Sequence, residues 1–367
     1  MCKCRLHNYK FGSIVMKKHI LLYTIFFLLA ATQISVAQVV GNANDFLDIG
    51  GFAAAQATGN ANGAYISGAE AGYLNPAALS MDGGKWDFAL MHNRYMGGMA
   101  TQNMAAAACK TDSLTTFGAT LVRVGVDDIQ NTLHLFDSDG KINYDNISYF
   151  SVADYALYFS FGRQLKRIPA LTIGGNVKLI YRHEGDFANA YGFGIDLAAR
   201  YTWRRLSCAA VLRDATTTFD FWSVNESKFD SSYLATGNTV PESRLEQRSP
   251  SLLLSAAYRM QRGDFGAVAM AALRSYFGYN TQYVVHSDFA SVDPALGLEL
   301  SYKDIVMVRG GVSDFQNDSN MTISHKTSAR PSIGAGLRLY GFRVDYAFFF
   351  SGAMGEGSNV VTVGYGF

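Results

Sequence analysis

A strict alternation of side-chain character over the last part of the chain limits most strongly what it can fold into. In residues 333–339, 342–348 and 361–367, every second side chain is apolar or aromatic, and those between are glycine, alanine, arginine, aspartate or threonine. A period of two sends neighbouring side chains to opposite faces of a β-sheet. These three stretches therefore predict strands with one wholly apolar face.

The same alternation recurs upstream, in residues 155–161, 171–182, 191–201 and 251–260. The runs are roughly 9–11 residues long, the length that a tilted strand needs to cross a bilayer. Charged residues make up only 17% of the chain, against about 25% in an average soluble domain. Because no run of about 18 apolar residues follows residue 37, a bundle of membrane-spanning helices is excluded.

The N-terminus reads as a secretory leader. Lys17 and Lys18 form a basic start, an apolar run follows them, and residues 35–37 (Ser-Val-Ala) form a small-residue cleavage site. Met16 is a second candidate start, which would make the residues before it an upstream extension. We therefore expect residues 1–37 to be removed and exclude them from the fold.

Removal of the leader changes the net charge. The whole chain has 31 basic and 30 acidic residues. The leader holds five of the basic residues and none of the acidic ones, so the mature chain carries a charge of about −4. Nothing in this balance indicates a nucleic-acid partner.

Two kinds of fold accommodate an alternating apolar face. A soluble sandwich turns it inward between two sheets, whereas a transmembrane barrel turns it outward to lipid. The export signal favours the barrel, and aromatic residues at strand ends, such as Tyr201 and Trp203, resemble interface girdles. The chain also ends on Phe367 in an alternating strand, which resembles the C-terminal assembly signal of outer-membrane barrels. We predict an all-β transmembrane antiparallel barrel over residues 86–367, in the outer membrane of a Gram-negative cell.

The expected number of strands is about 14, because single-chain bacterial barrels almost always have an even number. The weakest candidate strands are residues 101–109 and 280–289, one of which exceeds this count. Short turns alternate with long connections at 127–151, 214–248 and 314–331. In such barrels the short turns face the periplasm and the long loops face outside.

The connection 214–248 is the candidate partner-contact loop. It is polar but carries the aromatic residues Phe219, Phe221 and Trp222. Binding energy at protein interfaces concentrates in a few buried aromatic anchors. We predict that these three side chains contact a partner.

Residues 38–85 do not alternate and are rich in glycine and alanine. Small residues let backbone segments pack closely, as a plug inside a barrel must, and inward polar side chains of the wall would satisfy its backbone groups. We predict a small N-terminal hatch here. A flexible periplasmic tail is the alternative.

Short motifs in this order resemble the PorV/PorQ family, which belongs with the FadL-like outer-membrane barrels. They are Phe46-Leu47-Asp48-Ile49-Gly50, Gly63-Ala64-Tyr65 and the hatch motif Asn75-Pro76-Ala77, followed by similar short motifs up to residues 345–347. The resemblance covers about residues 46–367. Leu74, Ala78 and residues 59–63 depart from the family pattern, which indicates a divergent paralogue.

The resemblance implies a 14-stranded barrel of a Bacteroidetes-like outer membrane, plugged by its N-terminus. It also implies a non-enzymatic component or accessory of the type IX secretion system. Translocon subunits and secreted client proteins would then be its partners, besides the outer-membrane lipid.

No catalytic or cofactor-binding pattern stands out in the sequence. There is no nucleophile elbow, Walker loop or dinucleotide fingerprint, and the histidines lack the spacing of a zinc site. A serine–histidine pair on adjacent strands, as in barrel hydrolases, is not visible from spacing. Cys109 and Cys208 show no redox spacing and are expected to be thiols. We therefore expect no enzymatic activity, no cofactor and no metal.

Three functions remain open at this stage. The first is the type IX secretion component, and the alternative is a FadL-like channel for hydrophobic small molecules. An apolar interior pocket of about 300 Å³ or more would favour the channel, and a filled, charged lumen would favour the secretion role. A soluble sandwich adhesin is the third.

Overall fold

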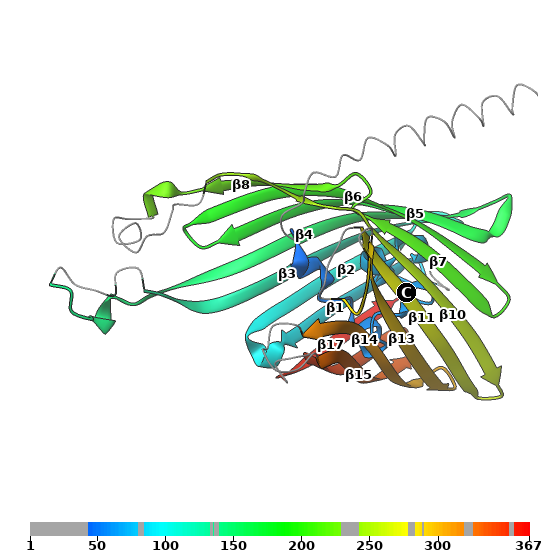
Figure 1. Ribbon diagram of the computed structural model, residues 1–367. Helices are drawn as coiled ribbons and strands as arrows, with labels where there is room; N and C mark the ends of the chain where they lie inside the picture. Colours follow the sequence, from blue (N-terminus) through cyan, green and yellow to red (C-terminus); the bar gives the residue numbers. More distant parts are fainter. Residues whose placement is uncertain are drawn as a thin grey trace, which may run out of the picture. The chain divides into compact units, whose positions relative to one another are not determined.

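The computed structural model describes residues 43–79, 84–132, 135, 139–228, 242–277, 283–287, 290–318, 326–351 and 356–367. The expected signal peptide lies outside the described residues. The described chain forms a closed antiparallel barrel with 14 wall strands, as expected (Figure 1). The wall strands are β1 (Trp86–Tyr95), β2 (Ala100–Lys110), β3 (Thr115–Asn131), β4 (Ser148–Leu165), β5 (Ile168–Glu184), β6 (Ala188–Trp203), β7 (Leu206–Arg213), β10 (Ser251–Arg262), β11 (Phe265–Phe277), β13 (Ala290–Tyr302), β14 (Val306–Asp318), β15 (Lys326–Leu339), β16 (Phe342–Ser351) and β17 (Glu356–Gly366).

The first and last strands close the ring. β1 pairs with β17 from Asp87 opposite Gly366 to Arg94 opposite Asn359. Phe367 completes this seam, because its backbone N–H donates to the Trp86 carbonyl at 2.9 Å and its own carbonyl accepts from the Trp86 N–H at 2.9 Å. Closure leaves no strand edge between β1 and β17 to face lipid with unpaired backbone groups. The soluble sandwich is therefore wrong.

The apolar face of each strand points out of the barrel. In β1 exposed and buried residues alternate along the whole strand, and large apolar side chains such as Leu90, Val308 and Ile333 are 65%, 58% and 64% exposed. In water, this much exposed apolar surface would be strongly unfavourable. Lipid is the surrounding that matches it, which confirms the transmembrane barrel.

Several strands are longer than the sequence pattern predicted. β3, β4, β5 and β6 contain 17, 18, 17 and 16 residues, and Figure 1 shows β3 and β4 reaching far beyond their neighbours. Backbone pairing continues past the apolar stretch, because a paired ladder satisfies its own N–H and C=O groups in water as well as in lipid. The predicted loops 127–151 and 314–331 are therefore partly strand, and 127–151 also holds the short helix η5 (Tyr144–Asn146).

The described part of the predicted loop 214–248 is largely regular secondary structure. It contains β8 (Thr218–Val224), η6 (Glu226–Lys228) and β9 (Leu245–Arg248). The three aromatic residues predicted to form a contact loop therefore lie in strand β8. β8 continues the line of β7 along β6, and β9 pairs with β8.

The two weakest strand predictions have different outcomes. Residues 101–109 belong to β2, which pairs along its length with β1 and β3. Of 280–289, only β12 (Val285–His286) is a strand, and it pairs with β13. β11 pairs directly with β13, so β12 adds no strand to the ring.

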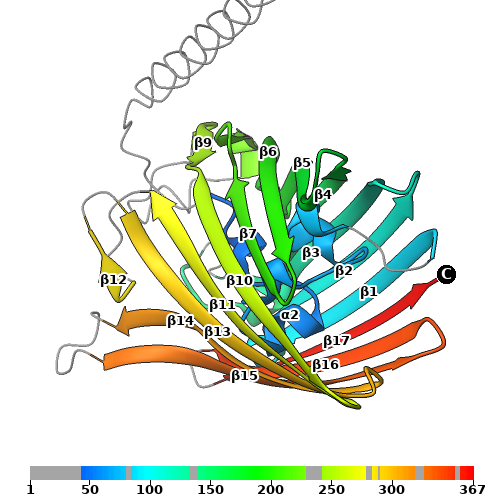
Figure 2. The same cartoon turned by 90° about the vertical axis from the view of Figure 1, so that its right-hand side faces the viewer.

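Residues 43–79, here called the inner segment, form five short helices: η1 (Asp45–Asp48), α2 (Ala53–Ala57), η2 (Asn62–Ala64), α3 (Ala71–Leu74) and η3 (Pro76–Ala78). Figure 2 shows this segment within the ring of strands, and the short helix η4 (Met96–Gly98) joins β1 to β2. No helix among the described residues has both the length and the apolar character needed to cross a bilayer.

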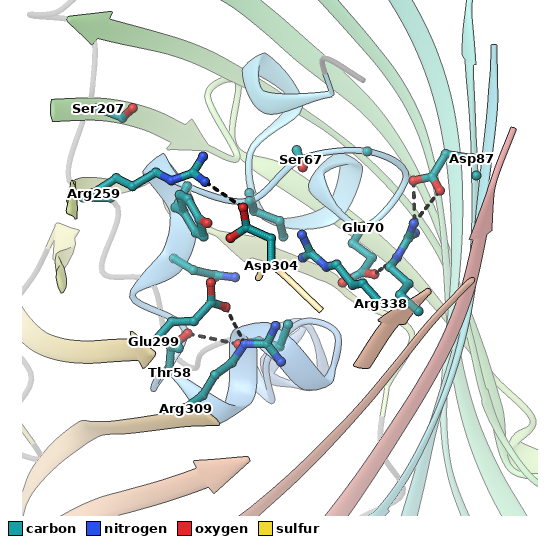
Figure 3. Close-up of a pocket in the computed structure, with 18 of the residues that line it drawn as sticks. Thr58, Ser67, Glu70, Asp87, Ser207, Arg259, Glu299, Asp304, Arg309 and Arg338 are labelled. Carbon is teal, nitrogen blue, oxygen red and sulfur yellow. Dashed lines mark hydrogen bonds and ion pairs between the residues drawn. The ribbon is translucent and has the colours of Figure 1, made fainter. Parts of the chain in front are cut away.

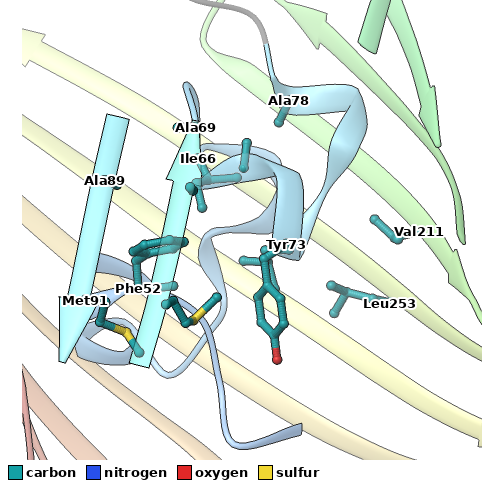
Figure 4. Packing of buried hydrophobic residues seen from close by; sticks show 14 of the residues in the cluster. Phe52, Ile66, Ala69, Tyr73, Ala78, Ala89, Met91, Val211 and Leu253 are labelled. Atoms are coloured by element: carbon teal, nitrogen blue, oxygen red, sulfur yellow. The ribbon is translucent and has the colours of Figure 1, made fainter. Parts of the chain in front are cut away.

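The apolar core lies between the inner segment and the wall. Phe52 and Leu74 are almost completely buried and pack with wall side chains such as Met91, Val211 and Leu253 (Figure 4). Most other members of this core are alanines. Small side chains allow the segment to approach the wall closely enough to exclude water.

Candidate functional site

The hatch motif lies against a pair of glycines in the wall. Gly162 of β4 and Gly174 of β5 are register partners. A Cβ on either residue would approach the Pro76 carbonyl oxygen to 2.7 Å, closer than real Cβ contacts. The wall is therefore glycine where the motif's backbone touches it.

The hydrogen bonds of the Asn75 side chain explain why the same motif contains a polar residue. Its side-chain oxygen accepts from the Ala77 N–H at 3.0 Å and caps η3, while its amide nitrogen donates to the Gly63 carbonyl at 2.8 Å. Asn75 is fully buried, so these bonds satisfy groups that would otherwise lack water. The motif holds two turns of the inner segment together against the wall.

The wall is interrupted at residues 214–217, here called the wall bulge. Leu197 of β6 pairs with Leu212 of β7, but Phe193 pairs with Phe219 of β8, so residues 194–196 lie opposite residues 213–218. Asp214 and Thr217 have φ angles of 53° and 63°, which are left-handed conformations that side chains rarely adopt.

The other side of the wall bulge lacks strand pairing. β7 pairs with β10 only as far as Arg213 opposite Ser251, and β8 pairs with β9 only from Thr218 opposite Arg248. Pro250 lies between these two ladders and has no N–H to donate. Among the described strands, the pairing of β7 with β10 therefore ends before the pairing of β8 with β9 begins, which leaves a gap in the hydrogen-bonded wall.

Buried charges surround the wall bulge. Lys178 pairs with Asp196 at 2.9 Å and with Asp214, and Arg248 contacts the other oxygen of Asp214 at 3.2 Å. All four side chains are at most 8% exposed. Burial of so many charges is tolerated because each has an opposite charge beside it.

Asp48 of the inner segment lies at the centre of a second charge cluster. It forms an ion pair with Arg248, and Arg213 and Arg274 lie 3.8 Å away. Burial raises the pKa of the Asp48 carboxyl, but the three arginines outweigh burial and hold that pKa below its ordinary value of 3.8. Asp48 therefore stays ionised and ties the inner segment to β7, β9 and β11.

The predicted contact residues do not share one surface. Trp222 faces the interior, where the Arg182 guanidinium lies 4.9 Å from its ring centre. Phe219 and Phe221 alternate with the fully buried Thr218 and Asp220, so they face outward, and Phe221 is 55% exposed. The structure brings Phe219 against Phe193 of β6, with ring centres 6.1 Å apart.

A cavity of about 740 Å³ opens between the inner segment and the wall. Several of its lining residues lie in or beside short strand connections, at Arg204 and Arg205, at Asp304, and at Tyr340 and Gly341. Figure 3 shows Asp304, Arg259 and Glu70 among the lining residues. We call this end of the barrel the short-turn end and the cavity the vestibule. Its lining includes seven arginines and four carboxylates: Arg200, Arg204, Arg205, Arg259, Arg309, Arg338, Arg343, Glu70, Asp87, Glu299 and Asp304.

Each vestibule carboxylate already has an arginine partner. Arg343 contacts Glu70 at 2.8 Å and Asp87 at 2.6 Å. Arg309 contacts Glu299 at 2.6 Å, and Arg259 contacts Asp304 at 3.2 Å. The vestibule is therefore polar and has more positive than negative charge.

Sequence reasoning missed Asp48, Asp214 and the acidic residue Glu70. Asp48 and Glu70 lie outside the strands, and Asp214 lies in a strand break, so alternation gave no information about their direction. An isolated acidic residue in a segment of small residues was the available signal for Asp48 and Glu70. Among the described residues, no group of three histidine, cysteine, aspartate or glutamate side chains could hold a metal ion, and Cys109 and Cys208 are free thiols.

Comparison with known proteins gives a result from structure alone. No protein-family model matches the chain, and no curated protein matches it by sequence. The barrel is similar to the Pseudomonas putida toluene transporter TodX, with a TM-score of 0.55, 14% identity, and 86% of this chain and 98% of that chain covered. It is also similar to the Ralstonia pickettii toluene transporter TbuX, with a TM-score of 0.51, 13% identity and coverage of 87% and 98%.

A Pseudomonas aeruginosa FadL homologue matches with a TM-score of 0.50, 10% identity and coverage of 87% and 98%. The match thus extends over almost the whole length of each of these proteins. The chain has the fold of the FadL-like outer-membrane transporters.

Proposed function

We propose that this protein lies in the outer membrane of a Gram-negative cell and passes small hydrophobic molecules across it. The observation that carries the proposal is the fold, which matches two toluene transporters over 98% of their length. This favours the alternative derived from the sequence over the type IX secretion role.

The wall bulge gives the proposal a physical route. A hydrophobic molecule that followed the barrel axis would have to pass the polar, arginine-lined vestibule. A gap in strand pairing beside the lipid-facing residues Phe219 and Phe221 gives a sideways exit, which passes the ion pairs of Asp214 rather than the whole vestibule. Transfer of such a molecule from water to lipid is favourable.

One observation favours the type IX secretion component, which remains the second candidate. The described interior is filled by the inner segment and by ion pairs such as Lys178–Asp196 and Arg309–Asp345, and the vestibule is polar rather than apolar. A filled barrel suits contact with translocon subunits or secreted clients through its outer wall. Deletion of the gene should then retain secreted proteins in the cell, and normal secretion would contradict this role.

Uptake measurements test the channel directly. Cells that lack their own hydrocarbon channels should take up radiolabelled toluene faster when they make this protein than when they carry an empty vector. Equal rates at equal cell-surface expression would contradict the channel function.

A removable cross-link tests the route. A Cβ on Gly72 of α3 would lie 3.6 Å from the Ser160 Cβ of β4, within the range for a disulfide. The pair Gly72→Cys and Ser160→Cys, in a chain with Cys109→Ala and Cys208→Ala, would fix the inner segment to the wall. If molecules leave sideways at the wall bulge, oxidation should leave uptake unchanged. If the inner segment must move, oxidation should lower uptake and a reductant should restore it.

A further inference from the structure

The vestibule has an excess of permanent positive charge. Its seven arginines face four carboxylates, and all four carboxylates are already bound by Arg259, Arg309 or Arg343. Arginine does not lose its proton in proteins. Arg309 also binds Asp345, so seven arginines face five carboxylates in all. Two positive charges therefore remain in excess in a partly enclosed space, which raises the local concentration of anions.

Two of these arginines are available to a ligand. Within the described chain, the guanidinium groups of Arg205 and Arg338 form no ion pair, and both side chains are exposed. Figure 3 shows that Arg338, Arg259 and Arg309 line the same cavity. A guanidinium presents parallel N–H donors that match the two oxygens of a carboxylate.

A buried and incompletely bonded group supports this independently. Arg309 is 3% exposed and lines the vestibule, and its Nη2 atom has no hydrogen-bond partner among the described residues. Its Nε and Nη1 atoms already bind Glu299 and Asp345. A buried donor without an acceptor is unfavourable, so an acceptor that reached this atom would stabilise it.

The vestibule is large enough for an organic molecule, and part of its lining is apolar. Its volume of about 740 Å³ lies within the range of small-molecule sites, about 300–1,000 Å³. Ile66 and Met270, which are 7% and 4% exposed, form part of its lining together with Ala257. The site combines arginine donors with an apolar surface.

From this arrangement we propose that the vestibule binds a small organic carboxylate with a compact apolar body, held by two vestibule arginines that form no ion pair within the described chain, Arg205 and Arg338. This goes beyond passage of neutral hydrocarbons, because it assigns a saturable anion site at the short-turn end. It does not depend on transport, since binding and uptake are separate measurements.

Equilibrium binding to the purified full chain in a non-ionic detergent tests the proposal. Benzoate is the probe, benzyl alcohol is its neutral counterpart, and inorganic phosphate is the anion without an apolar body. Benzoate should bind saturably, and at least about tenfold more tightly than benzyl alcohol, because only benzoate forms a charge-assisted pair with arginine. It should also bind more tightly than phosphate, because phosphate has no apolar body to place against the apolar lining. Added salt should weaken the binding of benzoate.

Matched variants separate the site from overall charge. Arg205→Gln with Arg338→Gln should weaken benzoate binding about tenfold or more. Lys166→Gln with Arg167→Gln removes the same charge from the turn between β4 and β5, also a short connection, but outside the vestibule, and should leave binding unchanged. Equal binding of benzoate and benzyl alcohol, tighter binding of phosphate, or equal losses in both double variants would overturn the proposal. Toluene uptake measured on the same variants reports separately on the channel function.

Discussion

At the scale of single residues, charge pairing and glycine contacts position the inner segment. Asp48 joins three arginines from three strands, and Arg343 of β16 holds both Glu70 of the inner segment and Asp87 of β1. These pairs are directional and long-range in sequence. They fix where the segment sits, whereas alanine contacts fix only how closely it packs.

Asp48→Asn is expected to destabilise the barrel by about 3 kcal/mol at neutral pH, because it leaves the largely buried Arg213 and Arg274 without the carboxylate they pair with, while Arg248 keeps Asp214. The free energy of unfolding in lipid vesicles, from urea titration, measures this. Arg259→Gln, which breaks the exposed pair with Asp304, is the control and should cost about 1 kcal/mol or less.

The Asp48 effect should depend on pH. The pKa of Asp48 is lowered in the folded chain from 3.8, so its contribution is fully present above pH 3.8 and is lost as pH falls through the folded pKa. The stability difference between the native chain and Asp48→Asn should therefore be constant from about pH 5 to 7 and shrink below pH 3.8. A difference that shrinks between pH 5 and 7 would assign the effect to another group.

Gly174→Ala tests the contact beneath the hatch motif. Its Cβ would meet the backbone of Pro76 and Ala77, and backbone cannot move aside as a flexible side chain can. We expect a loss of about 1–3 kcal/mol and faster proteolysis of the inner segment. Gly310→Ala is the control, because the nearest atom to its Cβ lies 3.9 Å away. Equal effects of the two substitutions would contradict the contact.

At the scale of elements, the line of β7 and β8 differs from the rest of the wall. Other register shifts in the wall, as in β3 between Val126 and Ile129, leave pairing with the partner strand on both sides of the shift. Positive φ angles occur in both places, at Asp214 and Thr217 in the wall bulge and at Asp128 in β3. The wall bulge differs because it faces Pro250 across a gap in pairing. Buried ion pairs stabilise it from inside.

Deleting residues 215–217 should bring β8 into register with β7 along β6 and make the wall continuous there. If molecules leave at this position, toluene uptake should fall toward the empty-vector rate while the barrel still folds. Heat-dependent mobility on gels reports folding. Deleting Asp128, which removes the small irregularity of β3, is the control and should change neither toluene uptake nor gel mobility. Unchanged uptake in a folded 215–217 deletion would rule out the wall bulge as the route.

At the scale of the whole molecule, lipid determines which side chains face outward. Apolar residues cover the outside of a closed ladder, while Lys178, Asp196 and Arg309 are buried inside it. This is the reverse of a soluble protein, and it follows because the surrounding bilayer solvates apolar groups and cannot satisfy backbone polar groups.

Depth in the bilayer should govern the cost of an outward charge. Leu298 lies within β13 and Tyr302 at its short-turn end, and both point outward, 46% and 44% exposed. Leu298→Arg should cost about 2–4 kcal/mol and Tyr302→Arg about 0–1 kcal/mol for the charge at its depth, measured by urea titration in vesicles. Similar costs at both positions would contradict a membrane-spanning orientation.

Much of the architecture was accessible from sequence. The alternation in residues 333–339, 342–348 and 361–367 is local, and each residue's face follows from its parity. Because the apolar runs are long enough to cross a bilayer, each strand must pair on both sides, and a closed sheet is the way to achieve this. The barrel, its even strand number and the outward aromatics were therefore predictable, whereas loop boundaries were not, because pairing continues after the apolar pattern ends.

The sequence by itself determined a closed barrel with apolar residues outside, because period-two patterning acts between neighbouring residues. Tertiary structure alone decided that Gly162 and Gly174 meet the hatch motif, that Phe219 and Phe221 lie in a strand, and that the vestibule is rich in arginine. These features depend on strand register and on contacts between residues far apart in the chain. A shift of one position in register would send each side chain to the opposite face of the wall.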